Sequence, residues 1–102
     1  MFNFFQPLVD IRVQEGEKLV LEIIVHGHPE PIVKWFRETI EINNSPDYQV
    51  VQQNDRYLLI IAEVFPEDAG RYEAVAVNAE GITRTEANIY VEGQYNLCVI
   101  FC

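Results

Sequence analysis

This sequence of 102 residues has few basic residues and only two cysteines. Seven lysines and arginines stand against sixteen aspartates and glutamates, which gives a formal net charge of -9. Because nucleic acids and anionic membrane surfaces are bound mainly through clustered Lys and Arg, this balance argues against both as primary partners. It is compatible with basic protein partners.

The only two cysteines, Cys98 and Cys102, lie close together near the end of the sequence. They cannot link distant parts of a fold, so cysteine usage indicates a reducing compartment and a cytoplasmic location. The N-terminal MFNFFQP lacks the positive segment and apolar run of a signal peptide. No run of about 18 apolar residues is present, so we expect neither an export signal nor a membrane helix.

Signatures of catalysis are also missing from the sequence. It contains no Gly-rich phosphate loop, and its acidic residues are scattered over turns and outward strand positions. His26 and His28, followed by Glu30, have a metal-like spacing, but two histidines without further ligands make an incomplete site. The sequence therefore predicts no enzyme, no cofactor and no metal.

What the sequence does contain is a succession of short runs rich in Val, Ile, Leu and aromatic residues, separated by turn signals. Gly, Pro, Asn and Asp mark these turns, and only residues 63–68 suggest a single helical turn. This pattern is typical of an all-β sandwich or barrel. The length is that of one domain with a single two-layer core.

Alternation within the runs assigns residues to faces of the sheets, because successive strand side chains point to opposite sides. In LVLEIIVH, for example, one face carries four aliphatic side chains and the other carries Val20, Glu22, Ile24 and His26. Pro7 should interrupt pairing and split the first strand into residues 4–6 and 8–13. The expected core consists of Leu19, Leu21, Ile23, Val25, Val33, Trp35, Tyr57, Leu59, Ile61, Val64, Tyr72, Ala74, Ala76, Ala87, Ile89 and Val91.

Four segments together resemble an I-set immunoglobulin domain of the titin-like and palladin-like muscle proteins. They are EGEKLVLEIIVHGHPEPIVKWFR, PDYQV, LLIIAEVFPEDAGRYEAVAVNAEG and EANIYVE, and the resemblance covers roughly residues 4–92. The joint spacing of GxPxP, Trp35, DxGxY and NxxG is specific to this fold and much less specific to one protein. The resemblance implies an immunoglobulin-like β-sandwich of two antiparallel sheets.

The chain departs from the family at two positions that often hold a disulfide, where it has Ile23 and Ala74. The resemblance places Trp35 between them at the centre of the sandwich. A large Ile facing a small Ala roughly conserves volume, which close-packed cores tolerate best. We interpret the pair as an adaptation to a reducing cell interior, with a neutral substitution in a large repeat family as the alternative.

Asp68, Gly70 and Tyr72 have the spacing of a tyrosine corner, the turn that leads into a central strand of the immunoglobulin fold. The resemblance implies that the Tyr72 hydroxyl bonds to upstream backbone while Gly70 permits the tight turn. It also suggests an ion pair between Asp68 and Arg56. A structural role is therefore expected for these residues in place of a catalytic or metal-binding one.

Outward-facing apolar residues are the candidate partner surfaces. The expected outer face of one sheet carries Phe36, Val75 and Val77, and that of the other carries Ile24, Leu58 and Ile60. Clusters of this kind mark docking surfaces in some proteins, but single exposed apolar residues are ordinary. Both readings stay open for either face.

We expect a single immunoglobulin domain over residues 1–92 and an apolar tail, GQYNLCVIFC, over residues 93–102. The tail suits a docking strand, a non-native terminus or an acylation site, and the sequence does not choose between them. The resemblance implies a non-catalytic module that spaces neighbouring immunoglobulin or fibronectin units and docks cytoskeletal proteins in a sarcomere or cytoskeleton. The alternatives are an adhesion or receptor ectodomain module, or a regulatory immunoglobulin domain of a muscle kinase.

Overall fold

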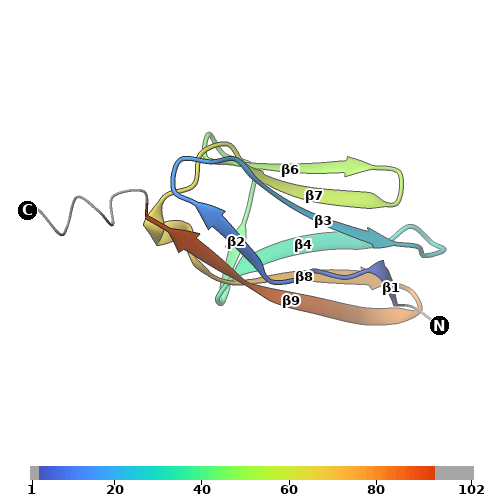
Figure 1. Ribbon diagram of the computed structural model, residues 1–102. Helices are drawn as coiled ribbons and strands as arrows, with labels where there is room; N and C mark the ends of the chain where they lie inside the picture. The colour runs from blue at the N-terminus through green and yellow to red at the C-terminus, as the bar shows by residue number, and fades with distance from the viewer. Residues whose placement is uncertain (1–2, 94–102) are drawn as a thin grey trace, which may run out of the picture.

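A computed structural model describes residues 3–93, which form two sheets packed face to face (Figure 1). The first sheet has the strand order β1-β3-β7-β6, and the second has the order β2-β9-β8-β4-β5. A single 3-10 turn, η1 (Pro66–Asp68), lies within the stretch where one helical turn is expected. The strands are β1 (Phe4–Gln6), β2 (Ile11–Gln14), β3 (Leu19–Val25), β4 (Ile32–Arg37), β5 (Ile40–Ile42), β6 (Tyr48–Gln53), β7 (Arg56–Ile61), β8 (Gly70–Asn78) and β9 (Gly81–Glu92).

The core lies between the two sheets and is built from alternate residues of nearly every strand. The burial pattern of β3 shows this directly, since every second side chain from Leu19 to Val25 is buried. All of the expected core residues are buried except Val33 and Val91, which are half-buried and pack against the same core. Alternation alone was therefore sufficient to find the inner faces of the strands.

The first strand is split at Pro7, as expected, and its two pieces belong to different sheets. β1 pairs antiparallel with β3, whereas β2 pairs parallel with β9 in the second sheet. The expectation of wholly antiparallel sheets differs from the structure at this one pairing, because the chain crosses between the sheets without reversing its direction.

The crossing segment is held by side chains instead of a backbone ladder. The Leu8 N–H donates to Thr85 Oγ1 at 3.0 Å, and the Asn88 N–H donates to Asp10 Oδ1 at 2.8 Å. Leu8 is buried although it lies outside a strand. For this reason β2 begins at Ile11, later than the expected residue 8.

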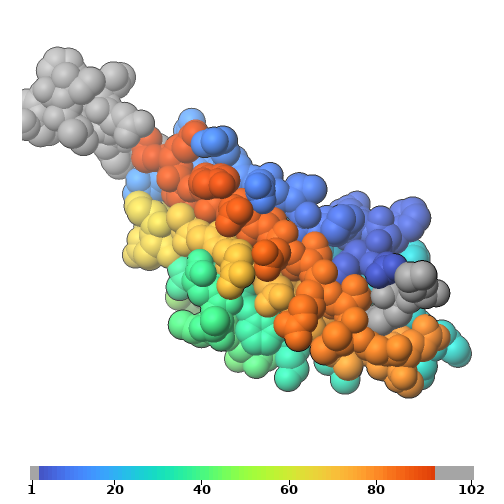
Figure 2. All heavy atoms as spheres, turned by 90° about the horizontal axis from the view of Figure 1, so that it is seen from below, coloured from blue at the N-terminus to red at the C-terminus, as the bar shows by residue number. Residues whose placement is uncertain are grey.

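The two ends of the sandwich carry the two ends of the described chain. Figure 1 shows β1 at one end, and the C-terminal end of β9 at the other. Figure 2 shows β9, in orange to red, as a band along the length of the molecule with the blue N-terminal segments beside it. A force applied through the two ends would therefore run along the strands.

Candidate functional site

The turn before β8 has the geometry of a tyrosine corner. Tyr72 is fully buried, and its hydroxyl donates to the backbone oxygen of Asp68 at 2.6 Å. Burial raises the pKa of Tyr72 above its usual range, since a buried phenolate would lose its hydration, and the nearby Tyr48 and Asp68 add to the effect. This tyrosine is therefore held neutral and bonded to upstream backbone as expected, while its structural role stays a prediction.

Asp68 accepts hydrogen bonds within its own turn. It is 9% exposed, its Oδ1 accepts from the Tyr48 hydroxyl at 3.1 Å, and its Oδ2 accepts from the Phe65 N–H at 2.8 Å. A carboxylate that accepts a backbone N–H at the start of a helical turn satisfies an otherwise unpaired donor. Asp68 therefore joins η1 to β6, the edge strand of the first sheet.

The expected ion pair between Asp68 and Arg56 was wrong. Arg56 Nε donates to Glu22 Oε2 at 2.8 Å, and this bond is the main reason why the pKa of Glu22 lies below its usual range. Arg56 begins β7, whereas Asp68 follows the other end of the strand. Five residues of extended strand span about 17 Å, which is too far for an ion pair.

Gly70 permits a close approach as well as a turn. Its φ is 143°, a conformation that residues with a side chain rarely adopt, and a Cβ there would lie 2.8 Å from Glu38 Oε2. The same Glu38 oxygen accepts the Arg71 N–H at 2.8 Å. Gly70 thus allows the carboxylate of Glu38 to bond the first residues of β8.

The centre of the core contains no disulfide, because the described residues include no cysteine. Ile23, Trp35 and Ala74 are buried together in one cluster. Trp35 lies directly opposite Ala74 in the register of β4 and β8. The large indole therefore has a small residue beside it in the sheet, while the facing of Ile23 and Ala74 and their balance of volumes stay predictions.

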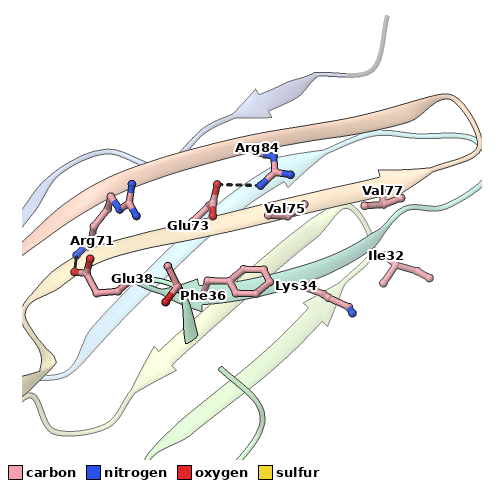
Figure 3. Close-up of a pocket in the computed structure, with 10 residues that line it drawn as sticks. Ile32, Lys34, Phe36, Glu38, Arg71, Glu73, Val75, Val77 and Arg84 are labelled. Atoms are coloured by element: carbon pink, nitrogen blue, oxygen red, sulfur yellow. Dashed lines mark hydrogen bonds and ion pairs between the residues drawn. The ribbon is translucent and has the colours of Figure 1, made fainter. Parts of the chain in front are cut away.

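The outer face of the second sheet carries the candidate partner residues Phe36, Val75 and Val77. They line a hollow of about 500 Å³ over β4, β8 and β9, shown from above in Figure 3. Phe36 is half-buried and Val75 is buried beneath its neighbours, so Val77 is the most exposed of the three. Whether this face docks a partner stays a proposal.

The pairing register of the strands adds two exposed apolar residues, Ile32 and Ile82, to the outer face of the second sheet. Ile32 lies opposite Val77, which in turn lies opposite Ile82, so an exposed apolar row crosses three strands. Ile82 was hard to recognise because it directly follows the turn at Gly81. The signal that could have found it is the hairpin register, which a tight turn fixes.

The remaining candidates are the two histidines, the outer face of the first sheet and the two cysteines. His26 Nδ1 lies 2.7 Å from Asp55 Oδ2 on the surface, and among residues 3–93 no three His, Cys, Asp or Glu side chains come together as a metal-ligand set. On the outer face of the first sheet, Ile24, Leu58 and Ile60 are half-buried. Within the described part of the chain, no helix has the length and apolar character needed to cross a bilayer. Cys98 and Cys102 lie outside the described residues.

Two packed sheets joined through a tyrosine corner, with a Trp opposite the corner strand, define an immunoglobulin-like domain. The profile of the Immunoglobulin I-set domain family matches residues 2–91, and the chain belongs to this family. Myopalladin of Mus musculus is 46% identical over 91 residues, which cover 89% of this chain and 7% of myopalladin. Titin of Drosophila melanogaster is 42% identical over 91 residues, 88% of this chain and less than 1% of titin.

A solved structure of the titin domains Z1Z2 in complex with telethonin resembles this chain with a TM-score of 0.88 and 40% identity. The match covers 91% of this chain and 47% of that one. These relatives are immunoglobulin-domain proteins of muscle and cytoskeleton. The chain spans less than a tenth of the length of the two curated relatives, 7% and less than 1%.

Proposed function

We propose that the chain is a non-catalytic structural and interaction module, one I-set domain of a titin-like sarcomeric or cytoskeletal protein in the cytoplasm. Its partners would be neighbouring immunoglobulin or fibronectin units and cytoskeletal proteins. The similarity to domains of myopalladin and titin supports this proposal. The titin Z1Z2 domains, in complex with telethonin, are a case of similar domains that bind another protein.

The observation that carries the mechanical part of the proposal is the parallel pairing of β2 and β9. Ile11 lies opposite Ile89, and the ladder continues to Gln14 opposite Glu92. β2 leads back towards the N-terminal end of the molecule, and β9 leads out at the opposite end (Figure 1). Tension would pull the two strands past each other, with their hydrogen bonds directed across the pull. Such bonds share the load and break together.

The pairing extends one bond beyond the ladder, since the Glu15 N–H donates to the Glu92 oxygen at 2.8 Å. In a parallel ladder, backbone N–H groups of alternate residues point to the same neighbour. The N–H of Val13 therefore points towards β9, whereas that of Arg12 points away. This difference provides a pair of variants, although Val13 is also a buried core residue and Arg12 also lies 3.6 Å from Glu92 in an ion pair.

The experiment is single-molecule unfolding of the chain placed between well-characterised marker domains. Val13→Pro removes an N–H that points into the ladder with β9. Arg12→Pro removes an N–H that points away from β9, on the outer edge of the sheet, where proline is tolerated. We expect the unfolding force to fall clearly for Val13→Pro and little for Arg12→Pro. If the folded Val13→Pro variant unfolds at the same force as the parent, the proposal that β2 and β9 carry the load is refuted.

A further inference from the structure

An apolar row crosses the outer face of the second sheet at the end nearest the β8–β9 turn. Ile32, Val77 and Ile82 lie in register on β4, β8 and β9, and they are 68%, 41% and 55% exposed. Figure 3 shows Ile32 and Val77 side by side at this end of the hollow. Water contacts all three side chains in the isolated domain, so a partner that covers the row would gain apolar burial.

The next row of the face is basic at both ends. Lys34 and Arg84 flank Val75, each opposite it in the strand register. Arg84 Nη1 lies 3.7 Å from Glu73 Oε2, but Lys34 has no ion-pair partner within residues 3–93. An unpaired ammonium beside an exposed apolar row favours a partner that brings a carboxylate.

The formal net charge of -9 repels an acidic partner at long range, but this repulsion does not remove the preference for a carboxylate at this face. The Debye length is about 8 Å at physiological ionic strength, so distant acidic residues are largely screened. Lys34 and Arg84 are the charges of the row next to the apolar row, and Glu80 lies in the β8–β9 turn just before Ile82. Two glutamates of the face, Glu73 and Glu86, lie in the following row opposite one another, and Glu38 lies at the far end of the hollow.

The spacing of the row matches an α-helix laid across the strands. Neighbouring strands lie about 4.8 Å apart, and successive turns of a helix are about 5.4 Å apart. One apolar side chain from each of three turns can therefore meet Ile32, Val77 and Ile82 in order. The helix is about 10 Å wide, so acidic residues on one flank would reach Lys34 and Arg84, whose row is about 7 Å away.

We propose that this face binds an amphipathic helix of another protein, with apolar residues one turn apart and carboxylates along one flank. The inference deepens the proposed function by naming the chemistry of the docked partner.

A second copy of the chain fits the face less well than such a helix. A two-fold axis along the strands would place Lys34 against Arg84 of the other copy. An axis across the strands through the middle of the hollow would place the apolar row against the charged end of the hollow, where Glu38 and Arg71 lie (Figure 3). The first arrangement brings two positive charges together, and the second places apolar side chains against charged ones.

The test uses the 102-residue chain and two synthetic, helix-stabilised peptides of about four turns. Both peptides carry leucines one turn apart; one carries glutamates along the flank and its twin carries lysines there. Binding is measured by calorimetry, and NMR shifts of the domain locate it. The matched variants are Lys34→Glu and Lys18→Glu, because Lys18 is an exposed lysine outside this face.

We expect the glutamate peptide to bind with shifts at Ile32, Val77 and Ile82, and the lysine twin to bind about tenfold more weakly. Lys34→Glu should reverse this order, and Lys18→Glu should keep it. The proposal is overturned if neither peptide binds at about 1 mM, if Lys34→Glu leaves the order unchanged, or if the shifts lie on the first sheet. The unfolding force of the free domain does not involve this face, so failure here would leave the mechanical proposal standing.

Discussion

Replacing Tyr72 by Phe isolates one hydrogen bond of the tyrosine corner. The change keeps the buried ring and removes only the hydroxyl, which donates to the Asp68 oxygen at 2.6 Å. Because the site is buried, water cannot easily replace the lost donor, and an unsatisfied buried acceptor costs about 1–3 kcal/mol. This is a substantial part of the roughly 5–15 kcal/mol that stabilises a domain of this size.

Urea denaturation gives the cleanest measurement of this cost. A loss of about 2 kcal/mol with a slope of about 2 kcal/mol/M lowers the midpoint by about 1 M, and the slope itself should not change. Tyr48→Phe is the control, since its hydroxyl meets the same aspartate at 3.1 Å from a half-buried position and should matter less. If Tyr72→Phe unfolds at the parent's midpoint, the corner does not stabilise the domain.

The same variant should also change the alkaline limit of stability. The pKa of Tyr72 is raised in the folded state, mainly by burial. The contribution of Tyr72 to the free energy of unfolding is then complete below a pH of about 10, which is the pKa of an unfolded tyrosine. This contribution is lost as the pH rises towards the higher pKa of the folded state. Tyr72→Phe should lose less stability than the parent between about pH 10 and 12. Parallel curves for the two proteins would contradict a buried, protonated Tyr72.

Two further predictions concern the core. Trp35→Ala should lower the free energy of unfolding by about 3–5 kcal/mol, because it removes a side chain that is only 1% exposed and leaves a cavity. This loss exceeds that of Tyr72→Phe, so urea midpoints in the reverse order would contradict the central position of Trp35. The double change Ile23→Cys and Ala74→Cys is made with Cys98 and Cys102 replaced by Ser, and it should form a disulfide on mild oxidation. The melting temperature should then rise, since closing a loop of about 50 residues stabilises a domain by about 4 kcal/mol. A folded variant that forms no intramolecular bond would show that the two Cα atoms are not within the required distance of about 7 Å.

The sequence was sufficient for the parts of the fold that depend on local pattern. Alternation predicted the buried faces, and Pro7 predicted the split of the first strand, because both follow from the geometry of a single strand. The resemblance to I-set domains supplied the architecture, a sandwich of two sheets. The tyrosine corner could be recognised because its parts lie within a few residues of one another.

Features that depend on register or on distant segments were harder to predict. Asp68 was assigned to Arg56, but the partner of Arg56 is Glu22, which lies close only through the pairing of β3 with β7. Likewise, alternation indicates on which face Ile32 and Ile82 lie, but only the pairing of three strands aligns them in one row. A pattern within one strand contains no information about its neighbour.

The long strand β9 gives the two proposed activities separate places. Its last residues, from Ile89, pair with β2 and would carry load, whereas Ile82 and Arg84 near its start would contact a bound helix. Arg84 and Ile89 are five positions apart in the strand, which corresponds to about 17 Å, well beyond the reach of a direct contact. β8 stays paired with β9 along the first part and holds that part in place regardless of what happens at β2. The two proposals together therefore predict that a helix bound at the start of β9 leaves the unfolding force of the β2–β9 pair unchanged.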